Sequence, residues 1–490
     1  MSELTQIAGS AGPITRDVEG HRSELVRGLG LWPATAAVVG VVIGTAIFLV
    51  GSEVARDTRS AALSIAAWIG GGLLALCGAL CLAELGAAMP CAGGIYAYLT
   101  RGLGPAWGFL YGWTSSTVIE TATCAGIAAG FLRLIGFLVP AVATPLFSFH
   151  IPGLFQAKTY EFAFTVAQPS AAGVILLLTA LNYLSVRSGG RIQLLATSLK
   201  VGAIAVLIAL GFVSQRGDSA NLLPSSMPIA AGAVGAFLAA LVPIMWAYNG
   251  WHLLGPVGEE VENPGKNFPR ALVFSMLAVM ALYVLANWVY LRVLAFPGVA
   301  QSSHVASDVF QMLVGKGGAK WLTIAMMISG LGCLHINILA AARIPFAMAR
   351  DGLFFRFAKR VQPTFRSPSG GLLFVGGVSA LLALSGTYEE LLSLVIFALW
   401  IFLSLSAVAL IRLRITEPAL PRPYATWGYP WTPILFLLSG LAMTVNLWLD
   451  RPIRSTIGLG IILLGLPFYF HWRKKSDVTV SPDMGAAKRV

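Results

Sequence analysis

Residues 246–272 read WAYNGWHLLGPVGEEVENPGKNFPRAL, a stretch that starts inside an apolar run and ends as a charged loop punctuated by prolines. The apolar run carries Tyr248, Asn249 and Gly250 in its middle, and Pro243 lies just before them. Proline lacks an N–H donor, and the Asn-Gly pair favours non-helical dihedral angles. We therefore expect a helix that is broken inside a hydrophobic segment.

The composition of the whole chain indicates that this segment lies in a lipid bilayer. Of 490 residues, 57% are hydrophobic and 11% are charged, and the mean hydropathy is +0.78. Apolar stretches of about 20 residues, the length that crosses ~30 Å of hydrocarbon, recur along the chain. The sequence predicts an all-α polytopic membrane protein with twelve transmembrane helices. The expected spans are 31–50, 62–88, 103–137, 169–186, 189–213, 229–255, 270–293, 320–349, 370–386, 389–411, 431–448 and 455–472.

A second span shows the same kind of interruption. Residues 31–50 read LWPATAAVVGVVIGTAIFLV, with Gly40 and Gly44 near the midpoint. Five spans separate the start of this span from the start of the other broken span, and an odd number reverses the orientation of the second set. This arrangement predicts a five-plus-five inverted repeat. The expected parts are an N-tail (1–30), two repeats (31–213 and 229–411), a final helix pair (431–472) and a C-tail (473–490).

The paired breaks predict a binding site. Unwound backbone does not face lipid, so it lines a cavity. Half-helix N-termini attract an anion and free carbonyls accept from an ammonium group, which together suit a zwitterion. The alternative is structural: Gly40 and Gly44 have the GxxxG spacing of close helix packing, and Trp246, Tyr248 and Trp251 are core aromatics. The match between two spans favours the cavity.

The distribution of positive charge predicts the orientation. With the N-tail in the cytoplasm, 21 Lys and Arg residues lie on the inner side and 8 on the outer side. This split predicts that both termini are cytoplasmic. The expected location is the cell inner (plasma) membrane, as a multi-pass protein in contact with lipid. The split also accounts for the net charge of +12 without a nucleic acid partner, because the charges lie in separate loops.

Several stretches resemble one known family. They are VVIGTAIF (41–48), AELGAAMPCAGGIYAYL (83–99), LNYLSVRSGGRIQLLATSLKVGAI (181–204) and the opening stretch, 246–272. Together they resemble amino acid permeases of the amino acid-polyamine-organocation superfamily, in particular bacterial members of the L-type amino acid transporter family. The resemblance implies a LeuT-like fold with broken helices 1 and 6, and transport of amino acid substrates, commonly by obligate exchange.

The resemblance also implies site residues. The break that holds the substrate carboxylate matches Ile43, Gly44, Thr45 and Ala46. The break for the amino group and side chain matches Trp246, Ala247, Tyr248 and Asn249, with Trp246 at the aromatic gate position. The family has Gly-Ser-Gly where this chain has Gly44-Thr45-Ala46, and a glycine where it has Asn249. The added bulk leads us to expect small or medium neutral amino acids.

Ionisable residues inside apolar spans are functional candidates by default. Lys200 lies deep in its span, and the resemblance places it beside the first break, where sodium-coupled relatives hold a sodium ion. An ammonium there predicts sodium-independent transport. Glu120 is a candidate for proton coupling or for a polar network. We interpret Glu84 as structural and assign His335 and Arg343 to packing, with Arg343 close enough to the inner surface to snorkel.

Other classes of function find little support. The sequence has no GxxxxGK[ST], HExxH or GxSxG motif, so we expect neither an enzyme nor an ATP-driven pump. The five cysteines show no metal-ligand spacing, and we expect no metal or cofactor. Animal members of the family bind an accessory glycoprotein through a cysteine after span 3; residues 138–168 contain none, so we expect no disulfide-linked subunit.

Two alternatives to exchange remain open. One is a proton-coupled amino acid symporter that uses Glu120, and the other is a transport-dead amino acid sensor. The loop 259–270 is expected to face the cytoplasm, with glutamates that pair with Arg or Lys at an inner gate rather than act in catalysis.

Overall fold

The computed structural model describes residues 25–475, apart from residues 26, 45, 49, 152–159, 185, 215–216, 219–220, 222–231, 303, 316 and 386–387. The predicted site residue Thr45 is therefore outside the described residues. The first half contains α1 (Leu31–Val42), η2 (Ala46–Phe48), α2 (Val50–Thr58), α3 (Ala61–Ala88), α4 (Ile95–Leu103), α5 (Pro105–Thr114), η3 (Ser115–Ile119), α6 (Glu120–Leu138), η4 (Pro140–Ala143), β1 (Pro145–Ile151), β2 (Tyr160–Thr165), α7 (Ala167–Leu184) and α8 (Val186–Val213).

The second half repeats the pattern of long helices joined by short connections. It contains α9 (Gly232–Ala247), η6 (Trp251–Leu254), η7 (Gly258–Glu260), α10 (Pro264–Gln301), α11 (Val305–Val314), α12 (Gly318–Ala341), α13 (Arg343–Arg350), η8 (Arg356–Lys359), α14 (Ser369–Ser385), α15 (Tyr388–Thr416), α16 (Trp431–Asp450) and α17 (Pro452–Lys475).

The predicted class, an all-α polytopic membrane protein, is confirmed. Among the described residues, ten helical segments are long and apolar enough to cross a membrane. They correspond to ten of the predicted spans. The other two, 31–50 and 370–386, appear as the shorter apolar helices α1 and α14. A count of twelve membrane crossings remains a prediction.

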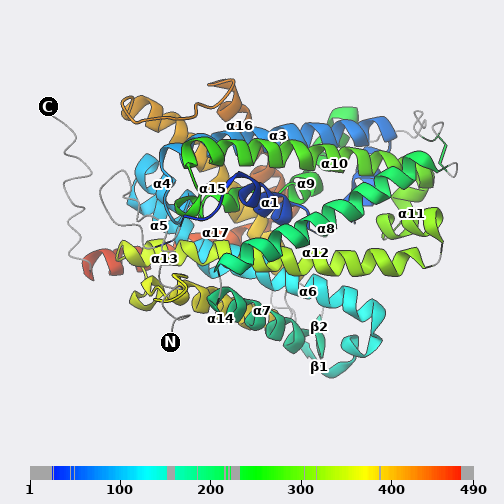
Figure 1. The fold of residues 1–490 in the computed structure, drawn as a ribbon, viewed down its shortest axis with the longest axis horizontal. Helices are drawn as coiled ribbons and strands as arrows, with labels where there is room; N and C mark the ends of the chain where they lie inside the picture. The colour runs from blue at the N-terminus through cyan, green and yellow to red at the C-terminus, as the bar shows by residue number, and fades with distance from the viewer. Residues whose placement is uncertain are drawn as a thin grey trace, which may run out of the picture.

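The two ends of the bundle differ in the elements that cover them. Figure 1 shows α4 and α13 at one end of the long axis, whereas α11 and the β1–β2 hairpin lie at the other. The strands pair antiparallel, with Phe147 opposite Phe164 and their rings stacked at 4.9 Å. We call the end with α4 and α13 the inner end, because it is the one predicted to face the cytoplasm.

Helix α1 lies inside the bundle rather than at its edge. It packs against α8, α10, α12 and η6 (Figure 1). Its residues from Val38 to Val42 are buried, as expected for an apolar segment surrounded by other helices. The first half of the broken span therefore touches η6, which directly follows the break in the other broken span.

Candidate functional site

The first break follows α1. The helix ends at Val42, and Ile43 leaves helical geometry with ψ of 80°. Its amide still donates to Val39 O, and Gly44 N donates to Val42 O at 2.8 Å. A Cβ added to Gly44 would meet no atom within 4 Å. Gly44 thus borders open space, which fits a break that faces a cavity rather than a packed helix interface.

Lys200 of α8 reaches the carbonyls of this break. Its Nζ donates to Gly40 O at 2.7 Å, to Ile43 O at 2.9 Å and to Ser329 O of α12 at 3.2 Å. The side chain is only 1% exposed, so three carbonyl oxygens replace its water shell. A buried ammonium is tolerated when its N–H groups are satisfied in this way. The sequence analysis expected this contact, and the structure contains it.

The second break follows α9. The helix ends at Ala247, and Asn249 N donates to Trp246 O at 3.1 Å. Gly250 then adopts φ of 118°, which is strained for any residue with a side chain. A Cβ at Gly250 would also lie 2.5 Å from Cγ1 of Val41 on α1. Glycine is required here both by the turn and by the close approach of the first broken span.

Tyr283 of α10 joins the two breaks. Its hydroxyl lies 2.9 Å from Val42 O and 3.1 Å from Ala247 O, so it is shared between the last carbonyls of α1 and α9. The side chain is fully buried. Sequence analysis did not single out Tyr283, because one tyrosine in an apolar helix resembles ordinary core filler.

A cavity, here called the central cavity, lies between the breaks. Its walls come from both broken spans and from α6, α12 and α15. The lining residues are Val41, Val42, Gly44, Ala46, Ile119, Glu120, Thr123, Ile127, Trp246, Asn249, Gly250, His252, Leu253, Cys333, Asn337 and Leu399. The site candidates Gly44, Ala46, Glu120, Trp246 and Asn249 are thus brought together.

Three other candidates do not line this cavity. Ile43 is buried and contributes its carbonyl to Lys200, and the Ala247 carbonyl accepts from Tyr283. The ring of Tyr248 packs at 5.1 Å from that of Tyr283, and its hydroxyl donates to Trp68 O at 3.1 Å. These residues shape the breaks, but their side chains are not in the wall of the central cavity.

Glu120 has a partner that the sequence analysis missed. His252 Nε2 lies 3.5 Å from Glu120 Oε1, and the two side chains are 3% and 2% exposed. Glu120 begins α6 directly after the π-helical turn η3, and His252 belongs to η6 after the second break. A π-helical turn inside an α-helix often marks a functional site.

α12 supplies the remaining polar wall. Cys333 and Asn337 line the central cavity one helical turn apart, and the Asn337 amide donates to Cys333 O at 2.8 Å. The Asn337 Oδ1 atom has no hydrogen-bond partner among the described residues. Their periodicity in an apolar span was a signal for this face, but the sequence does not say which face of a buried helix meets the cavity.

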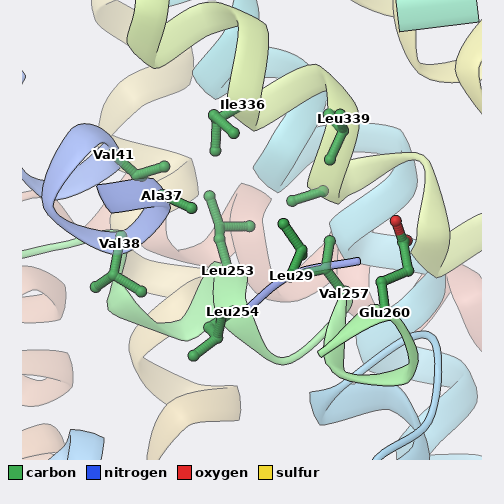
Figure 2. A pocket seen from close by; sticks show the side chains of 12 residues that line it. Leu29, Ala37, Val38, Val41, Leu253, Leu254, Val257, Glu260, Ile336 and Leu339 are labelled. Carbon is green, nitrogen blue, oxygen red and sulfur yellow. The ribbon is translucent and has the colours of Figure 1, made fainter. Parts of the chain in front are cut away.

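A second, apolar cavity lies toward the inner end. It shares Val41, Gly250 and Leu253 with the central cavity, and Glu260 lies at its edge (Figure 2). The full lining is Leu29, Ala37, Val38, Val41, Gly250, Leu253, Leu254, Val257, Glu260, Ile336, Leu339 and Ala340. The two cavities therefore adjoin at Val41, Gly250 and Leu253.

Ion pairs close the inner end around that second cavity. Arg343 donates to Glu260 through Nε at 2.7 Å and through Nη2 at 3.1 Å, and also to Leu339 O. Glu259 pairs with Arg350 at 3.3 Å. The prediction that loop glutamates pair with basic residues is confirmed for Glu259 and Glu260, whereas Glu262 is exposed. Arg343, assigned to packing, is 1% exposed and does not snorkel, because the bidentate carboxylate satisfies its charge inside the protein.

Two further candidates, Glu84 and His335, lie away from both cavities. Glu84 pairs with Arg414 at 2.5 Å and accepts from Thr426 N at 2.7 Å, as its structural interpretation predicts. His335 is buried on α12 outside both cavities.

Tyr96 of α4 adds another contact at the inner end. Its hydroxyl donates to Asp351 at 2.6 Å. Burial and the Asp351 carboxylate raise the pKa of Tyr96, so the hydroxyl remains a donor at neutral pH. Among the described residues, no group of three potential metal ligands is present.

Membrane-length helices and a cavity lined by two breaks are the arrangement of a LeuT-like fold, which secondary transporters use. A sequence model of the family described as "Amino acid permease" matches residues 29–466. The chain therefore belongs to the amino acid permease family. The family and the relatives found are transporters, not enzymes.

Three relatives illustrate the similarity. The chain is 28% identical to the serine/threonine exchanger SteT of Bacillus subtilis (strain 168) over 454 residues, or 92% of this chain and 98% of that protein. It is 30% identical to the b(0,+)-type amino acid transporter 1 of Oryctolagus cuniculus over 406 residues, which covers 83% and 80% of the two chains. It is 29% identical to the Asc-type amino acid transporter 1 of Mus musculus over 463 residues, covering 93% and 83%.

Proposed function

We propose that this permease exchanges small or medium neutral amino acids across the cell inner membrane without sodium. The observation that carries the proposal is the ammonium of Lys200, which donates to Gly40 O and Ile43 O of the first break. A fixed cation at these carbonyls takes the place in which a coupling ion would bind. Without an ion to drive net movement, a second amino acid moving the other way supports turnover.

The substrate lies between the two breaks in this proposal. Its carboxylate contacts the backbone around Gly44 and Ala46, where a half-helix N-terminus favours an anion. Its ammonium faces the end of α9 near Trp246, and Asn249 lines the side-chain pocket. The Ala247 carbonyl already accepts from Tyr283, so we assign it a smaller share of the ammonium contact than the sequence suggested.

The proposed substrate class rests on the pocket and on the relatives. Asn249 and Ala46 add side-chain atoms to the central cavity where family members have glycine. Relatives described as serine/threonine and Asc-type transporters support small neutral substrates. The human cystine/glutamate transporter is also 28% identical, so family membership alone does not select the substrate.

We further propose that 31–213 and 229–411 form the inverted repeats, with both termini in the cytoplasm. The placement of the ion-paired residues Glu259 and Glu260 with α4 and α13 at one end of the bundle supports an inner gate there. We propose that no disulfide-linked subunit is needed, since residues 138–168 contain no cysteine.

Flux in proteoliposomes tests the exchange proposal. Purified protein is reconstituted with or without internal serine, and uptake of labelled serine is followed in sodium-free buffer. We expect uptake only when the lumen contains amino acid, with alanine and serine competing better than leucine, tryptophan, lysine or glutamate. A strict sodium requirement would contradict the role of Lys200, and best competition by tryptophan or a charged amino acid would contradict the pocket.

The same assay addresses a proton-coupled symporter, which the presence of Glu120 in the cavity wall favours. A symporter accumulates serine in empty vesicles when an inward proton gradient is imposed. An exchanger does not, because it needs an amino acid on the opposite side.

A further inference from the structure

The contact between Glu120 and His252 has no role in the exchange described above. Both residues line the central cavity, and their side chains are almost completely buried. Their closest atoms, Glu120 Oε1 and His252 Nε2, are 3.5 Å apart. The other ring nitrogen of His252, Nδ1, has no hydrogen-bond partner among the described residues. No second partner among the described residues therefore fixes His252 in one tautomer.

The surroundings of Glu120 contain no other cation among the described residues that line the cavity. The titratable groups that face it are Tyr111 from α5 and Cys124 from its own helix, and α12 adds Cys333 to the same wall. None of these carries a positive charge. α15 contributes apolar Leu399 to the lining. An ionised carboxylate buried here depends on His252 for charge compensation.

The number of protons on the pair decides the charge of the cavity wall. With one proton the pair is neutral in total, whichever residue holds it. A second proton leaves a neutral Glu120 and a positive His252.

The position of His252 connects this charge to the substrate. Only Gly250 and Trp251 separate it from Asn249, and the end of α9 receives the substrate ammonium in the proposed function, on which this step rests. Two positive charges inside a water-poor cavity repel each other more strongly than in water. A second proton and a bound amino acid therefore oppose one another.

We propose that Glu120 and His252 form a proton-binding site linked to the substrate site, so that protonation of the pair weakens amino acid binding. Linkage is reciprocal, which means that binding of the amino acid releases protons to the same extent. The proton is thus a second ligand of the central cavity. His252 connects the second break to this linkage, and Glu120 connects the start of α6.

Equilibrium binding tests the proton site in two ways: by the effect of pH on serine binding, and by the protons released when serine binds. The apparent Kd of purified full-length protein for labelled serine is measured between about pH 5.5 and 8. We expect the Kd to rise about five- to tenfold toward acidic pH, the range of a typical coupling between two sites. In weakly buffered solution with an indicator dye, serine should release a fraction of one proton per molecule near the midpoint.

Variants assign the effect to the pair. His252→Gln and Glu120→Gln should each flatten the pH dependence and abolish proton release, and both are read only in monodisperse protein. His471→Gln, at an exposed histidine of α17, is the matched control and should keep the wild-type profile. A pH-independent Kd in the wild type, or a profile unchanged by both variants, overturns the proton site alone. Absence of serine binding at every pH overturns the linkage together with the proposed function.

Discussion

Each of the two breaks is a short non-helical stretch in an apolar span, but the side chains that contact them differ. Carbonyls of the first break are occupied by side chains of the protein, with Lys200 on Gly40 and Ile43. The second break presents Trp246 and Asn249 to the central cavity. Both breaks line the central cavity, but the first carries a built-in cation on its carbonyls, whereas the second presents two large side chains to the cavity. We infer from this difference that the first break is the fixed half of the proposed site and that the second break selects the substrate.

The largest effect on exchange is expected at the first break, from substitution of Lys200. Lys200→Ala removes the donor to two carbonyls of the first break; Ile43 O keeps the Ser329 hydroxyl at 3.3 Å, whereas a buried acceptor left unsatisfied costs about 1–3 kcal/mol. We expect exchange to fall at least about 30-fold, since 1.4 kcal/mol is a factor of ten. Serine exchange in proteoliposomes measures the rate, and size-exclusion chromatography checks the fold. Lys266→Ala, at an exposed lysine, should behave as the wild type; equal activity of both variants would refute the distinction between the breaks.

A smaller loss of exchange is expected from substitution of Trp246, the proposed gate residue of the second break. Trp246→Ala removes a half-buried aromatic wall of the central cavity. Loss of such apolar contact is worth about 1.5–3 kcal/mol, so we expect roughly tenfold slower exchange of every substrate. Trp431→Ala serves as control, because that ring is 74% exposed on α16. A loss confined to one substrate would mean that Trp246 selects substrates and does not act as a gate.

Tyr283→Phe tests the connection between the breaks. The variant deletes the hydroxyl shared by Val42 O and Ala247 O while retaining the ring. Hydrogen bonds of this kind contribute about 1 kcal/mol, so a roughly fivefold decrease in exchange is expected. The control is Tyr290→Phe, on the same helix as Tyr283. It removes a hydroxyl that lies 3.5 Å from Ile47 O and should have little effect. Similar losses for both variants would indicate a general packing role.

The mildest change concerns selectivity. Asn249→Gly enlarges the side-chain pocket, so leucine and larger neutral amino acids should compete with serine roughly fourfold better, the value of one methylene contact at ~0.8 kcal/mol. Competition uptake gives the profile. Asn263→Gly is the matched control, since Asn263 is exposed and has φ of 45°, a conformation that glycine adopts readily. An unchanged competition profile for Asn249→Gly would show that the second break does not line the pocket for the substrate side chain.

Hydropathy was sufficient to predict the membrane-length helices because hydrocarbon imposes a length and excludes charge. It also located both breaks, since Gly44 and the Asn249–Gly250 pair contradict the helix pattern around them. The predicted end of one span at residue 293 lies two residues before Ala295, where α10 departs from helical angles. The β1–β2 hairpin and α4 were missed, because short segments outside the hydrocarbon obey no such length rule.

The partners inside the site were harder to predict. Lys200 stood out because a charge deep in an apolar span is costly, so its contact with the first break was expected. Tyr283, His252 and Asn337 gave no comparable signal: a tyrosine, histidine or asparagine in an apolar helix becomes informative only when the facing helix is known. Tertiary packing decides which of them meets the central cavity.

A density map of the protein bound to serine, obtained by cryo-electron microscopy in sodium-containing buffer, tests the central claim most directly. We predict serine density between Gly44 and Asn249, with the Lys200 ammonium still on the carbonyls of Gly40 and Ile43 and no separate ion density there. Serine bound elsewhere, or an ion at the first break with Lys200 displaced from it, would contradict the account.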